Sequence, residues 1–107
     1  MGFVYLLEFA NEDGIIYKIG FTRGSIKKRI EKLQTGNPYE IKELYSFPTK
    51  YNQKLEKTIH RYFNHCKLKG EWFSLDIKEV TNFISICEKF ENNFDLMKDN
   101  YFLNRFS

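Results

Sequence analysis

The sequence lacks the features that mark disulfide-rich, membrane-spanning and secreted proteins. Its two cysteines, Cys66 and Cys87, lie too far apart for a CxxC pair and are too few for a disulfide framework. No apolar run approaches the roughly 20 residues that cross a bilayer, and the N-terminus shows neither a basic segment nor a cleavage site. We therefore expect reduced thiols and an intracellular protein, in the cytoplasm, the nucleoid or the nucleus, with no membrane partner.

Zinc ligands and repeated segments are also scarce. His60, His65 and Cys66 lie in one segment, but a closed zinc site needs four ligands and the nearby sequence supplies no fourth. The chain has no internal repeat and no low-complexity linker. Its 107 residues therefore predict one domain with one core, which the 42% of hydrophobic residues suffice to fill.

Positive charge is present but unevenly distributed. The chain has a formal net charge of +3, yet residues 18–69 hold thirteen Lys and Arg against four Asp and Glu, a local balance of +9. Clustered cations bind polyanions by releasing counterions from them. The middle of the chain therefore favours nucleic acid as a partner, although a solvated helix surface in a lysine-rich protein accounts for the charge alone equally well.

The hydrophobic pattern predicts an α+β fold, with a small antiparallel three-stranded sheet flanked by helices in the order ββαβαα. The first two strands are joined by a turn-rich tetrad at 11–14, which makes them a hairpin. Ser25 and Asp76 are the predicted N-caps of the first and last helices. The predicted strands are 3–9, 15–20 and 41–47, and the predicted helices are 25–34, 52–65 and a last one from Asp76.

The helical spacing of apolar residues predicts which faces are buried. On the helix at 52–65 the expected buried residues are Leu55, Ile59, Tyr62 and Phe63. On the last helix they are Ile77, Val80, Phe83, Ile84, Cys87 and Phe90. Residues 67–70 are expected to form a basic loop, and residues 72–75 a short extended piece. The tail at 93–107 is too apolar for a free disordered end, so we expect it to dock on the domain at 1–92 or on a second copy, giving a homodimer.

Four motifs occur in a fixed order along the chain. They are Phe3-Val4-Tyr5-Leu6-Leu7, Ile16-Tyr17-Lys18-Ile19-Gly20 followed by a basic helix with Arg29, Leu55-Glu56-Lys57-Thr58-Ile59-His60-Arg61-Tyr62-Phe63, and Gly70-Glu71-Trp72-Phe73. Together they resemble the GIY-YIG nuclease core. The resemblance is to the compact branch of phage, viral and bacterial proteins, whose second motif reads KIG and whose domain closes with GEWF, and it covers a motif core at 3–75.

The resemblance implies a set of catalytic residues. Tyr5 stands in the tyrosine place of the first motif, Lys18 where the second motif usually has tyrosine, Arg29 at the catalytic arginine and Glu56 at the metal ligand. The expected cofactor is Mg²⁺ or Mn²⁺, since one carboxylate with waters and phosphate oxygens is a usual way to hold such an ion. The motif leaves open which of Tyr5, Tyr17 and Lys18 handles the proton.

The residues themselves agree with parts of this set. Arg29 borders the apolar stripe of its helix, whereas a surface ion pair is the alternative reading. Glu56 is the only acidic residue between Glu43 and Glu71, although it could equally be a salt-bridge partner on a basic helix. His60, one turn later, could contact the water of the metal, donate to phosphate or cap the core edge. Glu71 is expected to brace a cation.

The predicted function is a metal-dependent endonuclease that hydrolyses DNA phosphodiester bonds, and the charge pattern does not exclude RNA. The alternative is a nucleic-acid-binding module that keeps the fold without cutting, and a third possibility is a protein-interaction domain that uses the apolar tail. The residues expected to hold flanking nucleic-acid backbone are Arg23, Lys27, Lys28, Lys32, Lys57 and Arg61.

Overall fold

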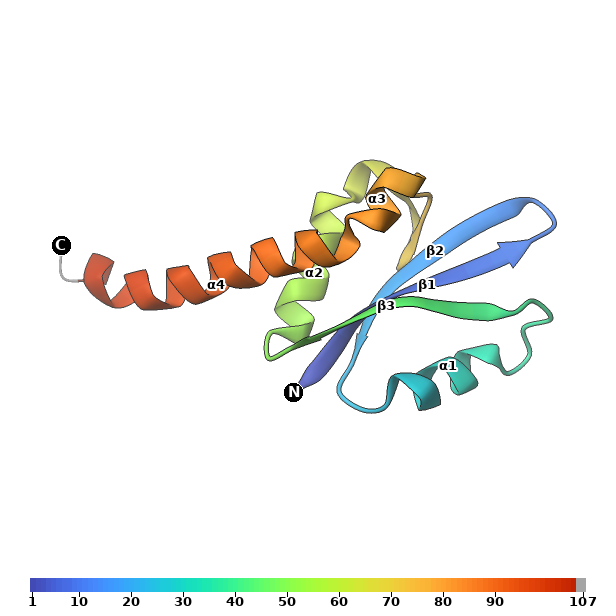
Figure 1. Cartoon of the computed structure of the whole chain (residues 1–107), viewed down its shortest axis with the longest axis horizontal. Helices are drawn as coiled ribbons and strands as arrows, with labels where there is room; N and C mark the ends of the chain where they lie inside the picture. Colours follow the sequence, from blue (N-terminus) through green and yellow to red (C-terminus); the bar gives the residue numbers. More distant parts are fainter. Residues whose placement is uncertain (106–107) are drawn as a thin grey trace.

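The chain forms an antiparallel sheet with helices on both faces (Figure 1). The structure, a computed structural model, describes the backbone of residues 1–105 and the side chains of residues 1–98. The strands are β1 (Gly2–Asn11), β2 (Gly14–Thr22), β3 (Ile41–Thr49), β4 (Lys67–Lys69) and β5 (Trp72–Phe73). The helices are α1 (Ile26–Gln34), α2 (Asn52–Tyr62), α3 (Ile77–Thr81) and α4 (Phe83–Arg105), and a 3₁₀ turn occupies Asn64–Cys66.

The sheet has five strands in the order β3-β1-β2-β5-β4, so the α+β class is confirmed but the predicted count of three is too low. The expected strands are β1, β2 and β3. The predicted extended piece begins as β5, whereas the predicted basic loop at 67–70 contains β4. Strands of two and three residues are too short to show the alternation of apolar and polar residues by which a strand is recognised.

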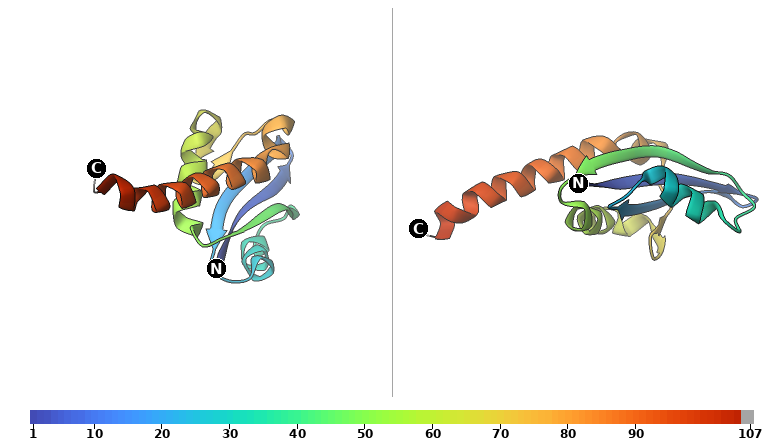
Figure 2. Two further views of the ribbon diagram at one scale, coloured as in Figure 1. Left: turned by 60° about the vertical axis from the view of Figure 1, so that its left-hand side comes forward. Right: turned by 90° about the horizontal axis from the view of Figure 1, so that it is seen from below.

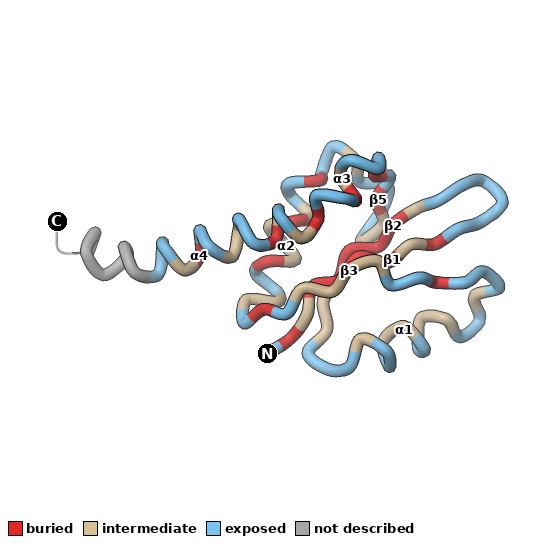
Figure 3. Tube along the Cα trace, viewed as in Figure 1, coloured by how far each residue is buried: buried red, intermediate tan, exposed pale blue. Residues whose placement is uncertain are grey.

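Each face of the sheet has its own apolar cluster because successive strand residues point to opposite sides. Tyr5, Leu7 and Phe9 of β1 face α1, whose partly buried Ile26, Ile30 and Leu33 cover them. The other face belongs to the larger cluster, shared with α2, α3 and α4. Figures 2 and 3 show α1 on one side of the sheet and the buried residues concentrated where β1 and β2 meet α2 and α4. This cluster includes Val4, Leu6, Tyr17, Ile19, Leu55, Ile59, Phe63, Phe73, Phe83 and Cys87.

Two of the predicted helices end differently from the prediction. The helix expected at 52–65 stops at Tyr62, whose side chain is exposed and not buried as predicted, because the chain turns into the 3₁₀ segment after Phe63. The last helix is divided by Asn82 into α3 and α4. Ile77 is exposed and not buried, because it occupies the first position of the short α3 and only Val80 of that helix reaches the core.

Both predicted N-caps are confirmed. The Ser25 hydroxyl accepts a hydrogen bond from the backbone N–H of Lys28 and so satisfies one of the amides at the start of α1. Asp76 and Glu79 form a reciprocal capping box at α3. These caps fix where α1 and α3 begin, and thereby which residues of α1 face the sheet.

The long helix α4 continues beyond the sheet through the position at which the tail was predicted to begin (Figure 1). Phe94 is buried and its ring meets that of Tyr51 at 5.3 Å, while Leu96 and Met97 are exposed. The side chains of Tyr101, Phe102, Leu103 and Phe106, also predicted to dock, lie outside the described residues, and the domain limit at residue 92 stays a prediction. Among the helices of residues 1–105, none combines the length and the apolar content needed to cross a membrane.

Candidate functional site

A tyrosine and an arginine meet beneath α1. Tyr5 lies on β1 with only 1% of its surface exposed, and the Arg29 Nε atom donates a hydrogen bond to its hydroxyl oxygen at 3.3 Å. Burial raises the pKa of Tyr5, while the hydrogen bond and the positive charge of Arg29 act to lower it. Because the hydroxyl accepts from Arg29, its own proton remains available for donation to another group.

The space for the Tyr5 hydroxyl is made by Gly20 on the neighbouring strand. The two residues are directly paired across β1 and β2. A Cβ atom at position 20 would lie 2.6 Å from the Tyr5 hydroxyl oxygen. Real side chains do not approach this closely, so the last residue of the second motif must be glycine for Tyr5 to keep its place.

A partly buried salt bridge lies on the same face of the sheet as Tyr5. Lys18 of β2 is 7% exposed, and its Nζ atom lies 2.7 Å from the Oε2 atom of Glu71. Trp72 places its ring 5.2 Å from the same ammonium. The backbone fixes this arrangement, since Lys18 pairs with Trp72 across β2 and β5. The prediction that Glu71 braces a cation is therefore confirmed, and the cation is Lys18.

Two carboxyl groups face each other at the edge of β2. The Glu56 side chain on α2 is 13% exposed, and a hydrogen bond joins its carboxyl group to that of Glu71. Burial, the charge of Glu71 and this hydrogen bond together raise the pKa of Glu56 to about 7, although Lys18 and Lys57 act in the opposite direction. Glu56 therefore carries a proton for much of the time near neutral pH.

His60 ties α2 to the same edge of β2. Its Nε2 atom lies 2.7 Å from the carbonyl oxygen of Ile19, and because a carbonyl only accepts, this nitrogen carries the hydrogen and donates. Burial lowers the pKa of His60, which favours the neutral ring. The Nε2 atom is also 4.0 Å from the Glu56 carboxylate, too long for a hydrogen bond. The structure therefore shows His60 in a structural role that was not among its predicted uses, the attachment of α2 to β2.

The donor atoms that could hold a cation come from three segments. One atom each of Glu56, His60 and Glu71 lie within 4.8 Å of one another. When Glu56 is ionised, the two carboxylates carry one more negative charge than Lys18 balances, and a divalent cation would offset that charge. The donor set therefore suits an oxygen-seeking ion such as Mg²⁺, for which Glu56 and Glu71 would be the ligands.

The structure brings together five of the six predicted catalytic residues and leaves out one. Tyr5 pairs with Gly20, two residues from Lys18, so Tyr5 and Lys18 point to the same face of the sheet. The charges of Glu56 and Glu71 also act to raise the pKa of Tyr5. Tyr17 instead lies in the large cluster on the opposite face of the sheet, where burial raises its pKa. The alternation of side chains along a strand is enough to predict that Tyr17 and Lys18 lie on opposite faces of the sheet, since they are neighbours in β2.

Glu71 is the residue whose importance the sequence underestimated. It lies in the turn before β5 and reaches the site because its carbonyl accepts a hydrogen bond from the Ile19 N–H at 3.1 Å. The closing motif marked the segment, but only the pairing of β5 with β2 shows that its carboxylate lies beside Glu56. The sequence predicted one carboxylate in the site, and the structure shows two, Glu56 and Glu71.

The predicted backbone-binding residues surround the site on two helices. All six are exposed. Lys27, Lys28 and Lys32 lie on α1 and Lys57 and Arg61 on α2, while Arg23 lies in the loop between β2 and α1.

Comparison with known protein families identifies the family of this chain. A family model described as the T5orf172 domain matches residues 2–88, which include every residue of the site. No curated protein and no solved structure matches the chain significantly.

Proposed function

Because the chain belongs to the T5orf172 domain family, a phage-derived domain associated with nuclease-type folds, we propose that it is a metal-dependent endonuclease of the GIY-YIG type that hydrolyses DNA phosphodiester bonds. The observation that supports this most is the convergence of Tyr5, Lys18, Arg29, Glu56 and Glu71 in one place. Phosphodiester hydrolysis needs cations, carboxylates that hold a metal and a group that orients water, and this cluster contains all of them.

Each residue has a role that follows from its contacts. The Arg29 guanidinium is held by Tyr5 through one nitrogen, so its remaining N–H groups can bind the oxygens of the scissile phosphate. Tyr5 orients the attacking water through its hydroxyl. Lys18 is held rigidly by Glu71 and neutralises charge on the phosphoryl group.

Glu56 and Glu71 would hold the divalent cation. Bound Mg²⁺ or Mn²⁺ would stabilise the negative charge that develops on the phosphate and leaving oxygens. His60 is a positioning residue, because its hydrogen bond to Ile19 fixes the turn of α2 that carries Glu56.

The test is cleavage of supercoiled plasmid and labelled DNA duplexes by the wild type, Glu56→Gln and Arg29→Ala. Glu40→Gln, at an exposed carboxylate before β3, is the matched control. We expect cleavage with Mg²⁺ or Mn²⁺, none with EDTA, and a loss of at least about a hundredfold in both site variants, with the control unchanged. Folded wild-type protein that cuts neither DNA nor RNA with any of these metals would contradict the proposal.

A second candidate is a nucleic-acid-binding module that does not cut. It is favoured by the internal pairing of the site, in which Lys18 and Arg29 are already bound by Glu71 and Tyr5. Binding that is tight, salt-sensitive and unaffected by EDTA or Glu56→Gln, without cleavage, would support this candidate over the nuclease.

A further inference from the structure

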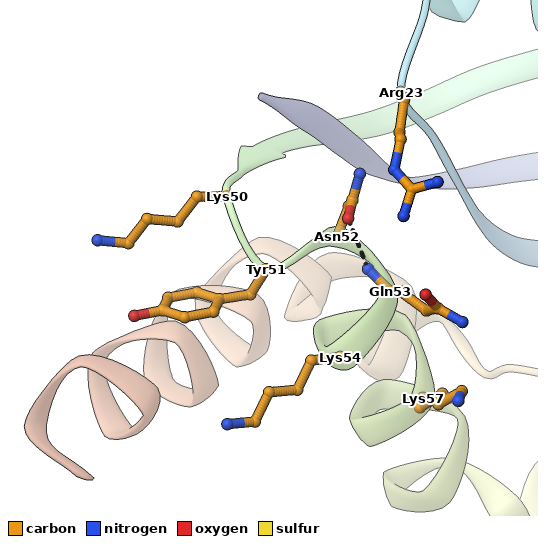
Figure 4. Close-up of a pocket in the computed structure, with 7 residues that line it drawn as sticks. All are labelled: Arg23, Lys50, Tyr51, Asn52, Gln53, Lys54 and Lys57. Carbon is orange, nitrogen blue, oxygen red and sulfur yellow. Dashed lines mark hydrogen bonds between the residues drawn. The ribbon is translucent and has the colours of Figure 1, made fainter. Parts of the chain in front are cut away.

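A basic hollow lies at the start of α2, apart from the carboxyl pair. Its volume is about 530 Å³, and Figure 4 shows the residues that line it. The cations that line it come from three segments: Arg23 from the loop before α1, Lys50 from the turn after β3, and Lys54 and Lys57 from α2. None of the residues that line it is acidic, so it offers a site for an anion.

Most of this charge is available to a ligand. Within residues 1–98, Arg23, Lys54 and Lys57 form no ion pair, and all three are exposed. Lys50 pairs with Asp95 at 3.5 Å, but both side chains are about half exposed, so the pair is weak and easily exchanged. Among the ion pairs described above, a phosphate that binds in the hollow therefore needs to replace only the weak Lys50–Asp95 pair.

Neighbouring groups hold these cations in place. The Lys54 ammonium lies 4.5 Å from the centre of the Phe94 ring, and the Arg23 guanidinium 5.8 Å from that of Phe21. Asn52 adds an amide, which packs so closely over Gly2 that a Cβ there would lie 2.3 Å from its Nδ2 atom. Figure 4 shows Asn52 and Arg23 at one side of the hollow and Lys50 and Lys54 at the other. The hollow therefore combines cations with amide groups, both of which bind phosphate oxygens.

The hollow is next to the site along α2. Lys57 lines it and directly follows Glu56, and Gln53 lines it three residues earlier. Three residues of helix rise about 4.5 Å along the axis, and phosphates of one DNA strand are spaced by about 3.4 Å along the duplex axis. A strand that runs along the axis of α2 with its scissile phosphate near Glu56 would thus place a phosphate one or two nucleotides away at the hollow.

We propose that this hollow binds a phosphate of the cleaved DNA strand one or two nucleotides from the scissile bond. The position of this phosphate relative to the cut rests on the proposed function, whereas the binding of a phosphate in the hollow does not. The exposed basic surface continues from the hollow through Lys57 to Arg61. A single small anion would leave that extension unused, whereas a phosphodiester strand contacts both parts.

The first test measures binding without cleavage. Fluorescence anisotropy of a labelled DNA duplex in EDTA would compare the wild type with the double variant Lys50→Ala/Lys54→Ala. The control is Lys78→Ala/Lys89→Ala, which removes the same charge from exposed positions on α3 and α4. Circular dichroism and urea midpoints would establish that each variant is folded.

We expect the hollow variant to reduce the slope of log K against log salt by about 0.9, since the hollow binds one phosphate and each phosphate contact contributes about 0.9. The control is expected to keep the slope of the wild type. Equal slopes and affinities for the hollow variant and the control would overturn the proposal, whether or not the protein cuts DNA. Inorganic phosphate that competes with DNA at equal phosphate concentration would also overturn it, because the hollow would then recognise a free anion.

The second test locates the phosphate. Methylphosphonate linkages, which are uncharged, would replace one phosphate at a time around the cut. We expect the linkage one or two nucleotides from the cut to weaken binding by the wild type and to have little effect on the hollow variant. The same loss in both proteins at that linkage would contradict the inferred contact. If the protein binds but never cuts, the series would instead be positioned by footprinting, and one linkage with this dependence would still support the hollow.

Discussion

Removal of the charge of Glu56 should stabilise the folded protein at high pH. The pKa of Glu56 rises from its ordinary 4.5 to about 7 because the carboxyl group is buried and faces Glu71. The side chain is only 13% exposed, so little solvent screening reduces this effect. At about 1.36 kcal/mol for each pH unit, the raised pKa corresponds to a cost of about 3 kcal/mol for ionising Glu56 in the fold.

The sign of the pH dependence follows from which state binds more protons. Below the unfolded pKa of about 4.5, Glu56 is protonated in both states and costs nothing. As the pH rises through about 7, the folded protein must give up a proton that it holds more tightly than the unfolded chain does. The wild type therefore loses stability over this range, whereas Glu56→Gln, which mimics the protonated group, does not.

The assay is urea unfolding of the wild type and Glu56→Gln between about pH 5 and pH 8.5 in EDTA. We expect the variant to gain about 2.5 kcal/mol relative to the wild type across this range, and Glu40→Gln to follow the wild type. Mg²⁺ should then restore stability to the wild type above pH 7 but not to the variant. A stability difference that is constant with pH would refute the inferred crowding of Glu56 and Glu71.

Three further predictions concern other parts of the molecule. Gly20→Ala should displace the Tyr5 hydroxyl, lower the unfolding free energy by about 1–3 kcal/mol and abolish cleavage. Gly24→Ala, at an exposed loop glycine, should leave cleavage intact. If Gly20→Ala unfolded and cleaved DNA as the wild type does, the close contact would be contradicted. Lys18→Met should leave Glu71 and Glu56 without their buried cation and so lower the stability of the apo protein by about 3 kcal/mol, read as a lower urea midpoint; an unchanged midpoint would show that the salt bridge contributes nothing. If the protein is a homodimer through α4, Leu96→Glu/Met97→Glu should reduce its mass in light scattering to that of a monomer, since both residues are exposed on the projecting helix, and an unchanged dimer would place the interface elsewhere.

The elements that the sequence predicted are those with enough residues to show a period. β1, β2 and α1 have apolar residues at clear intervals, and Ser25 and Asp76 have the residue types that helix caps require. β4 has three residues, and nothing in its sequence separates it from the predicted loop. The segment of β5 was predicted to be extended, but its two strand residues do not reveal that it pairs with β2. The exposure of Ile77 follows from the break at Asn82, which the spacing of apolar residues does not reveal.

A site residue could be predicted where the sequence pattern of its own helix or strand determines the direction of its side chain. Arg29 borders the stripe of α1 that covers β1, and it does reach Tyr5. Glu71 required knowledge of the strand register between β2 and β5, because only this pairing brings the turn before β5 to Lys18. The pairing of two distant segments depends on tertiary packing, which a local pattern in either one does not contain.

The two backbone hydrogen bonds of Ile19 indicate where this domain should tolerate insertions. Its N–H donates to the carbonyl of Glu71 and its carbonyl accepts from His60, so both carboxylate-bearing segments are positioned from one residue of β2. Residues 23–51, between β2 and α2, and residues 63–70, between α2 and Glu71, carry neither contact. Insertions in the turn after α1 or in the 3₁₀ segment should therefore change the outline of the domain while the spacing of the two carboxylates is kept, which makes these loops the places to graft new recognition segments.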